Sequence, residues 1–223
     1  MGVYQQFYDH WRDSPSKFRD TSTTYTLSLM DPDIESKLSI SPKHTTGNKI
    51  LVTRAYEDMH HRLLRLRGND KGRTQGVVIT GQPGIGGSII TRSAPPATSH
   101  RCMSAPGKTT FLGFMLARLI SAKQIVVLCN STKVLLFYCG RVYSQEASLG
   151  FRGLPINQHN AQYCPIWALV DSRKGGPNII RSSNIWPIQT SSPNPDRWKE
   201  WRKQNGAVVL GMPLWDTDDL VKG

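Results

Sequence analysis

The chain has 223 residues, 38% of them apolar, and a formal net charge of +12 at pH 7. This length suits one sizeable α/β domain rather than two, and no apolar run approaches the roughly 18 residues that a membrane-spanning helix requires. The 4 cysteines form no C-x-x-C pair, which excludes the usual spacing of a zinc site or disulfide framework. We therefore expect no membrane partner, and the basic excess favours contact with polyanions such as nucleotides or nucleic acid.

The N-terminal part is expected to be a short helix and an irregular arm. Aromatic residues three and four positions apart predict an amphipathic helix that docks on the body. The arm that follows is rich in Ser, Thr and Pro and has little periodicity. The N-terminus lacks the basic start and apolar stretch of a secretory signal. This favours an intracellular location, in the cytoplasm or nucleus. The aromatic residues are Tyr4, Phe7, Tyr8 and Trp11, and the expected division is an N-terminal region at 1–48 and a core at 49–223.

A helix is predicted over residues 49–67, where apolar residues recur at helical spacing and Gly68 closes the segment. His60 and His61 lie next to each other within it. Neighbouring residues on a helix point about 100° apart. We therefore expect these histidines to be solvated or packed, and not to share one metal ion.

A short β-rich run over residues 76–80 leads into a glycine-rich segment. Residues 81–86 read Gly-Gln-Pro-Gly-Ile-Gly, the first six positions of the phosphate-loop pattern G-x-x-x-x-G-K-[ST], but the Lys-Thr pair follows only at Lys108 and Thr109. Removing residues 87–107 restores the complete motif. A genuine insertion and a retained intron both stay open as explanations of that segment.

A phosphate loop works because successive backbone N–H groups converge on a phosphate at the positive end of the following helix. Its Lys reaches the β- and γ-phosphates, and its Ser or Thr binds Mg²⁺. We expect the interruption to weaken nucleotide binding and abolish hydrolysis, because the donors must converge closely on one phosphate. The predicted nucleotide-binding residues are Gly81, Gly84, Gly86, Gly107, Lys108, Thr109, Thr110 and Ser191.

After a helix at 110–120, five apolar runs predict mostly buried strands. The first two are too close for a helical crossover and are expected to form a hairpin or one bent strand. The span from 140 to 165 has only weak patterning. The predicted strands cover 125–129, 134–139, 166–170, 185–189 and 207–210.

The third of these runs ends in Asp171, the form of a Walker B segment, whose acid holds Mg²⁺ through water. Asp171 is the predicted catalytic residue, and the predicted metal ligands are Thr109 and Asp171. Ser172 stands where many ATPases have a Glu that positions the attacking water, which argues against hydrolysis. The next strand ends in polar residues at 190–192. Either they sense the γ-phosphate or Ser192 caps the following helix, and both readings stay open.

A helix from about Pro195 to Gln204 carries Trp198 and Trp201 among basic residues. Such interleaving can bind single strands by stacking, but packing of the two tryptophans on the sheet is the preferred reading. A further helix is expected to begin at Asp216, so that the chain stops before any C-terminal lid.

The chain resembles P-loop NTPase domains of fungal proteins related to the Crinkler and retrotransposon hot spot families. The resemblance implies an AAA-like or STAND-like fold, with a mainly parallel sheet between helices, and binding of ATP or GTP with Mg²⁺. In such domains a C-terminal lid commonly supplies a γ-phosphate arginine and oligomer contacts. The residues that carry the resemblance are 76–86 with 108–112, 191–195 with Trp198, Lys199 and Trp201, and 212–215.

The sequence thus predicts an α/β P-loop NTPase core of five or six mainly parallel strands with flanking helices, an NTP hydrolase by ancestry but inactive in this chain. Its expected partners are a nucleoside triphosphate, nucleic acid on the ground of charge, and another protein or a second copy through a C-terminal region that is missing from this chain. The alternative is a basic nucleic-acid- or protein-binding module that keeps the fold without nucleotide chemistry. Salt discriminates between them, because electrostatic binding to nucleic acid falls steeply with ionic strength.

Overall fold

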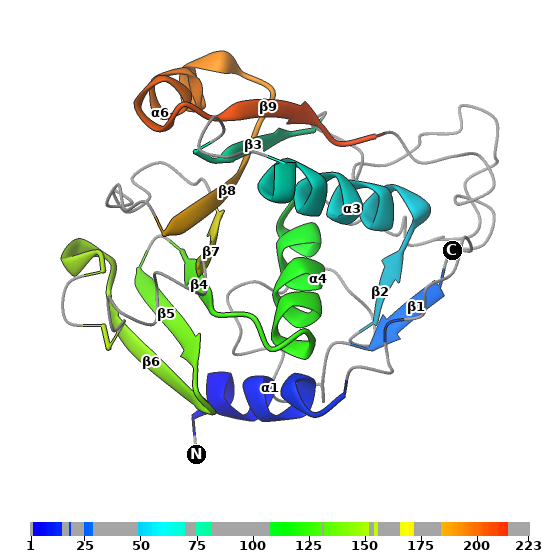
Figure 1. The fold of residues 1–223 in the computed structure, drawn as a ribbon, viewed down its shortest axis with the longest axis vertical. Coiled ribbons are helices and arrows are strands. Elements are labelled where there is room, and N and C mark those ends of the chain that lie inside the picture. Colours follow the sequence, from blue (N-terminus) through cyan, green and yellow to red (C-terminus); the bar gives the residue numbers. More distant parts are fainter. Residues whose placement is uncertain are drawn as a thin grey trace, which may run out of the picture.

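The computed structural model describes residues 2–14, 18, 25–28, 49–69, 75–81, 108–130, 132–151, 154–155, 166–171 and 184–213. In this part of the chain a seven-stranded sheet carries helices, and a separate two-stranded sheet lies beside them (Figure 1). The α/β class is therefore confirmed. The α-helices are α1 (Val3–Arg12), α3 (Arg54–Asn69), α4 (Lys108–Ser121) and α6 (Lys199–Asn205).

The large sheet has the strand order β6-β5-β4-β7-β8-β3-β9. The strands from β4 to β9 in this order run parallel to their neighbours, whereas β5 and β6 are antiparallel. The sheet is thus mixed, and it is larger than the five or six strands predicted. Its strands are β3 (Val77–Thr80), β4 (Val126–Cys129), β5 (Lys133–Tyr138), β6 (Arg141–Glu146), β7 (Ile166–Asp171), β8 (Ile185–Ser191) and β9 (Val208–Gly211).

Alternate residues of the central strands enter two different cores, as the period of two along a strand requires. In β7, Trp167 and Leu169 belong to the larger core with residues of α1, α3 and α4. Ala168 and Val170 face the other side, in a smaller cluster against which Phe151 packs. Both faces are buried, which is why these strands read as continuous apolar runs.

The strands predicted near 125, 134, 166, 185 and 207 are all present, and β4 and β5 form the predicted hairpin. Asn130 closes that hairpin, because its side-chain Oδ1 accepts hydrogen bonds from the backbone N–H groups of Thr132 at 3.0 Å and Lys133 at 2.7 Å. The strand β6, which lies in the weakly patterned span, was not predicted. Its residues are only partly buried, so the apolar signal of a strand is missing.

The region around residue 49 differs from the prediction. Strand β2 (Lys49–Val52) precedes α3 and pairs antiparallel with β1 (Tyr25–Ser28), which lies in the arm expected to be irregular. A short apolar run does not distinguish a strand from the start of a helix. Helix α3 then begins after Thr53, whose carbonyl accepts from the N–H of Tyr56 at 3.0 Å.

The predicted N-terminal helix is α1, and it is tied to two other elements. Phe7 and Trp11 are fully buried in the main core. Ser121 Oγ, at the end of α4, donates to the carbonyl of Trp11 at 3.0 Å. Gln5 accepts from the N–H of Val142 at 2.8 Å and donates to the carbonyl of Gly140 at 2.9 Å. The helix therefore fixes the lower end of α4 and the β5–β6 turn in place (Figure 1).

The predicted helix near 195–204 is split into a 3₁₀ turn, η3 (Pro195–Arg197), and α6. Gly206 ends α6 in a left-handed conformation with φ 54°, which glycine adopts without strain. The helix expected from Asp216 lies outside the described residues. Within the described part of the chain, no helix is long and apolar enough to cross a bilayer.

Candidate functional site

The carboxyl ends of β3, β8 and β7 meet at one edge of the sheet, because these strands are parallel neighbours. In the strand register Thr80 lies opposite Ser191, and Asp171 lies opposite Thr190. Neighbouring strands are about 4.8 Å apart, so Asp171 and the end of β3 stand about 10 Å apart with β8 between them. The edge therefore combines Asp171 and Ser191 with Gly81, the residue that follows β3.

The first turn of α4 belongs to the same edge. Helix α4 begins at Lys108 and lies against β4, β7 and β8. It connects to β4 through residues 122–125, and β4 runs parallel to β7, so α4 runs back across the sheet with its N-terminal end at the carboxyl edge. The first N–H groups of a helix lack intrahelical partners and attract anions. The backbone of Lys108 and Thr109 forms the N-terminal end of α4.

Several buried hydroxyl groups at this edge have no hydrogen-bond partner among the described residues. They come from the end of β8 and from the first turn of α4. Buried polar atoms are normally paired, and each one left unpaired costs about 1–3 kcal/mol. The edge thus has unused hydrogen-bonding capacity that an oxyanion or a hydrated cation could satisfy. The atoms are Thr110 Oγ1, Thr190 Oγ1, Ser191 Oγ and Ser192 Oγ.

The capping reading of Ser192 finds no support here. Asn194 Oδ1 accepts from the N–H of Asp196 at 3.0 Å, so Asn194 caps the turn that precedes α6. The hydroxyl of Ser192 remains without a partner in the described structure. The capping role that the sequence allowed for Ser192 therefore belongs to Asn194, two positions later.

The structure brings together only part of the predicted set. Gly81, Thr110, Asp171 and Ser191 lie at the carboxyl edge, Asp171 half-buried and Ser191 buried. For Lys108 and Thr109 the backbone alone is described. The remaining predicted residues, Gly84, Gly86 and Gly107, lie outside the described residues, together with the segment 87–107.

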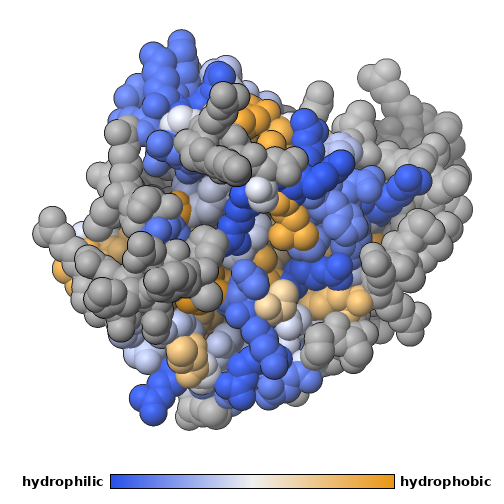
Figure 2. Space-filling model, in the orientation of Figure 1, coloured by the Kyte–Doolittle hydropathy of each residue, from blue (hydrophilic) through white to orange (hydrophobic). Residues whose placement is uncertain are grey.

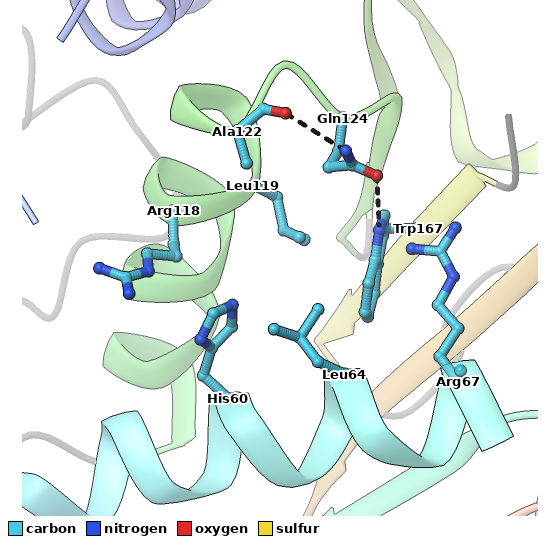
Figure 3. Close-up of a pocket in the computed structure, with 9 residues that line it drawn as sticks. His60, Leu64, Arg67, Arg118, Leu119, Ala122, Gln124 and Trp167 are labelled. Carbon is cyan, nitrogen blue, oxygen red and sulfur yellow. Dashed lines mark hydrogen bonds between the residues drawn. The ribbon is translucent and has the colours of Figure 1, made fainter. Parts of the chain in front are cut away.

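A separate cavity of about 420 Å³ lies between α3 and α4, towards the amino end of β7. Figure 3 shows Leu64 pointing towards Trp167, with Arg67 on the other side of the indole. The guanidinium carbon of Arg67 lies 3.9 Å from the centre of that ring. Trp167 Nε1 also donates to Gln124 Oε1 at 3.4 Å. Burial lowers the pKa of Arg67 to about 10, so it stays charged at neutral pH.

Beside this cavity a buried group of polar side chains surrounds Glu57. Tyr25 Oη donates to Glu57 Oε1 at 2.8 Å, and Arg118 Nη2 lies 3.5 Å from Glu57 Oε2. Burial, followed by the charges of Arg118 and His61, lowers the pKa of His60 to about 4. His60 is therefore neutral, and its 4.0 Å approach to Glu57 is not an ion pair. Burial and the bond to Glu57 raise the pKa of Tyr25.

The predicted packed and solvated histidines are confirmed, because His60 is buried against Phe114 and His61 is exposed, but their geometry does not exclude a shared metal ion. One possible ligand atom from each of Glu57, His60 and His61 lies within 4.8 Å of the other two. The two Cβ atoms point apart, but the imidazole rings extend far enough for their centroids to lie 5.6 Å apart. The i, i+3 spacing of Glu57 and His60 was the signal available in the sequence, and it was missed.

Comparison with known proteins identifies no relative of this chain. A scan against protein-family models finds no match, and searches of curated proteins and of solved structures find none either.

Proposed function

We propose that this chain is a nucleoside-triphosphate-binding domain of the P-loop type, which holds ATP or GTP with Mg²⁺ at the carboxyl edge of its parallel strands. The observation that carries the proposal is the meeting of β3, the acid at the end of β7 and the first turn of α4. Gly81 and Lys108 were predicted from the two halves of the interrupted phosphate loop, and Asp171 was predicted separately from the Walker B segment. Ligands of open α/β sheets bind outside the carboxyl ends of the strands.

Each predicted residue has a distinct role in this proposal. The N–H groups after β3 and at the start of α4 bind phosphate oxygens, and Lys108 neutralises their charge. Thr109 and Asp171 hold the Mg²⁺, the latter through water. Ser191, on the strand between them, reaches the γ-phosphate. The unpaired hydroxyls of Thr110, Thr190 and Ser191 support a polar ligand at this edge, because a phosphate would remove their desolvation cost.

The insertion at 87–107 weakens this binding. It separates the glycines at 81–86 from Lys108, whereas a complete phosphate loop joins them directly. A longer loop costs little closure entropy, about 0.6 kcal/mol for each doubling of its length. The loss is therefore one of alignment and not of stability. Hydrolysis is absent in this proposal, because Ser172 replaces the expected water-positioning acid and the phosphate donors are misaligned.

The test is thermal unfolding with and without Mg-ATP and Mg-GTP. We would compare the full chain, a chain that lacks residues 87–107, and the shortened chain with Lys108→Ala. Stabilisation of the shortened chain that Lys108→Ala removes supports the proposal and identifies the insertion as the cause of weak binding. Cooperative unfolding of both parent chains with no response to either nucleotide contradicts it.

A second candidate function rests on exposed basic residues. Figure 2 shows hydrophilic residues over α6 and along α3. A basic face suits a polyanion such as nucleic acid. Binding of single-stranded RNA that weakens steeply between 50 and 200 mM salt favours this function, whereas stabilisation by Mg-nucleotide that resists salt favours the first. The exposed basic residues are Arg54, Arg62 and Arg65 on α3 and Arg197, Lys199, Arg202 and Lys203 near α6.

A further inference from the structure

The group formed by Glu57, His60 and His61 on α3 is distinct from the carboxyl edge of the sheet. Glu57 and His60 are buried, with side chains 9% and 8% exposed, and His61 is exposed. The group therefore opens to solvent on one side. Its three possible ligand atoms lie within 4.8 Å of one another. They occupy positions i, i+3 and i+4 of one helix, which share a face of the helix closely enough for their side chains to converge.

Two atoms of this group have unused bonding capacity. Glu57 Oε2 and His60 Nδ1 are buried and have no hydrogen-bond partner in the described structure. They face each other at 4.0 Å, which is too long for a hydrogen bond. Among the described residues Oε2 has only the 3.5 Å ion pair with Arg118 Nη2 and Nδ1 has no partner, and a buried polar atom without a hydrogen bond is costly. One cation placed between them would satisfy both.

We propose that Glu57, His60 and His61 bind a divalent transition-metal ion. Imidazole nitrogen and carboxylate oxygen are the usual ligands of zinc and its neighbours, and sites with three protein ligands keep a further position for water or another small ligand. Zinc–ligand distances of about 2.1 Å place tetrahedral ligands about 3.4 Å apart. The observed separations are 4.0 Å and up to 4.8 Å. Small side-chain rotations would shorten them to this value.

Two neighbours of Glu57 affect its ability to bind a metal ion: Tyr25 favours binding and Arg118 opposes it. Tyr25 Oη donates to Oε1 at 2.8 Å, so that Oε2 is the oxygen that faces His60 at 4.0 Å, as a hydrogen-bonded carboxylate ligand requires. Arg118 Nη2 lies 3.5 Å from the same Oε2. Arg118 therefore competes with the metal for that oxygen and also repels it. Removing the charge of Arg118 should strengthen metal binding, an effect that a purely structural Glu57 would not produce.

The open coordination position has room beside it. His60 also lines the cavity between α3 and α4 (Figure 3). Water or a small anion that enters this cavity can complete the coordination, with Arg118 at the cavity wall to favour an anion.

The experiment uses the full chain after treatment with a chelator, titrated with zinc chloride in a calorimeter and with cobalt(II), whose absorption spectrum reports tetrahedral ligands. We expect binding that His61→Ala and Glu57→Gln each weaken at least tenfold. His10→Ala, which removes a histidine from α1, should leave the affinity unchanged. Arg118→Gln should strengthen binding several-fold. Circular dichroism confirms that each variant is folded.

Two results would overturn the assignment. The first is an absence of zinc binding by the wild-type chain. The second is equal affinity of the wild type and His61→Ala, which would place any bound metal elsewhere. Because His61 is exposed, its substitution does not endanger the fold, and this comparison decides the question even where the buried variants lose stability. Unchanged or weaker binding by Arg118→Gln counts against Glu57 as a ligand.

Discussion

Gly76 lies directly against Pro187, a proline inside the central strand β8. A Cβ atom at position 76 would lie 2.8 Å from Cγ of Pro187 and 2.9 Å from its carbonyl oxygen. Proline has no N–H to donate and is normally excluded from central strands. Here the ladder between β3 and β8 begins at Val77 and Ile188, one residue further on. The glycine thus leaves space for the proline ring at the point where the ladder has not yet started.

Gly76→Ala should therefore destabilise the fold by about 1–3 kcal/mol, the usual cost of overpacking a buried site. The neighbour is a ring and a backbone oxygen, which cannot move aside easily. Chemical denaturation measures the change. Gly68→Ala is the matched control, because an added Cβ there meets nothing within 4 Å and alanine favours the helix. Equal stability of Gly76→Ala and the parent would show that β3 and β8 can separate at this end.

A second prediction concerns Gln5, which joins α1 to the β5–β6 turn. Its amide donates to the carbonyl of Gly140 and accepts from the N–H of Val142. Gln5→Ala removes both of these bonds, together with one to Asp9 Oδ1 at 3.0 Å, and should cost about 1–3 kcal/mol, because partly buried backbone groups lose their partners. Gln6→Ala on the same helix is the control and should stay within about 0.5 kcal/mol. Similar losses in both variants would mean that helix propensity, and not the link to the turn, sets the effect.

The parallel part of the sheet was predictable because its strands are buried on both faces. Residues 125–129 and 166–170 are continuous apolar runs, each followed by a polar residue, Asn130 or Asp171, a pattern with few alternative explanations. Strand β6 gave no such signal, since it is an edge strand with exposed positions at Arg141 and Ser144. Strand β2 was misread as helix for a related reason. Its partner β1 is distant in sequence, and only that pairing separates a strand from a helix start.

The candidate sites show the same division. Asp171 and Ser191 could be predicted as ends of apolar strands, and their position at one edge follows from parallel strands alone. The group around Glu57 could not be predicted in the same way. It depends on Tyr25 and Arg118, which come from distant parts of the chain to a single carboxylate. The spacing of residues on α3 gives the helix face, but not the partners that leave Glu57 Oε2 turned to the histidines.

Thiol reactivity provides a third prediction. Burial raises the pKa of Cys129 to about 12, whereas Cys139 is exposed in the β5–β6 turn. At pH 8.5 the thiolate fraction of Cys129 is then on the order of one in three thousand, and the thiolate is the reactive species. Iodoacetamide should therefore modify Cys139 in the folded protein and Cys129 only after denaturation. Mass spectrometry of the separate cysteine peptides measures both. Rapid modification of native Cys129 would indicate that β4 opens to solvent.

A fourth prediction tests the acid at the end of β7. In the chain that lacks residues 87–107, Asp171→Asn should reduce Mg-ATP affinity at least tenfold, which is about 1.4 kcal/mol of ligand-induced stabilisation. In the proposed site this substitution removes the negative charge that holds hydrated Mg²⁺. Thermal unfolding with ATP in EDTA is the control, and there the two proteins should behave alike. A loss of equal size without Mg²⁺ would assign Asp171 to folding and not to the metal.

The last prediction concerns the guanidinium of Arg67, which lies 3.9 Å from the ring centre of Trp167. Arg67→Met keeps an unbranched side chain over the indole but removes the cation, so the loss includes the cation–π attraction, which contributes about 0.5–2 kcal/mol. Arg65→Met, at an exposed position of the same helix, controls for the change in net charge. The stabilities come from urea denaturation of both variants. Removal of the guanidinium also removes the cost of its desolvation. A more stable Arg67→Met would therefore show that this desolvation cost exceeds the stabilisation from the cation–π contact.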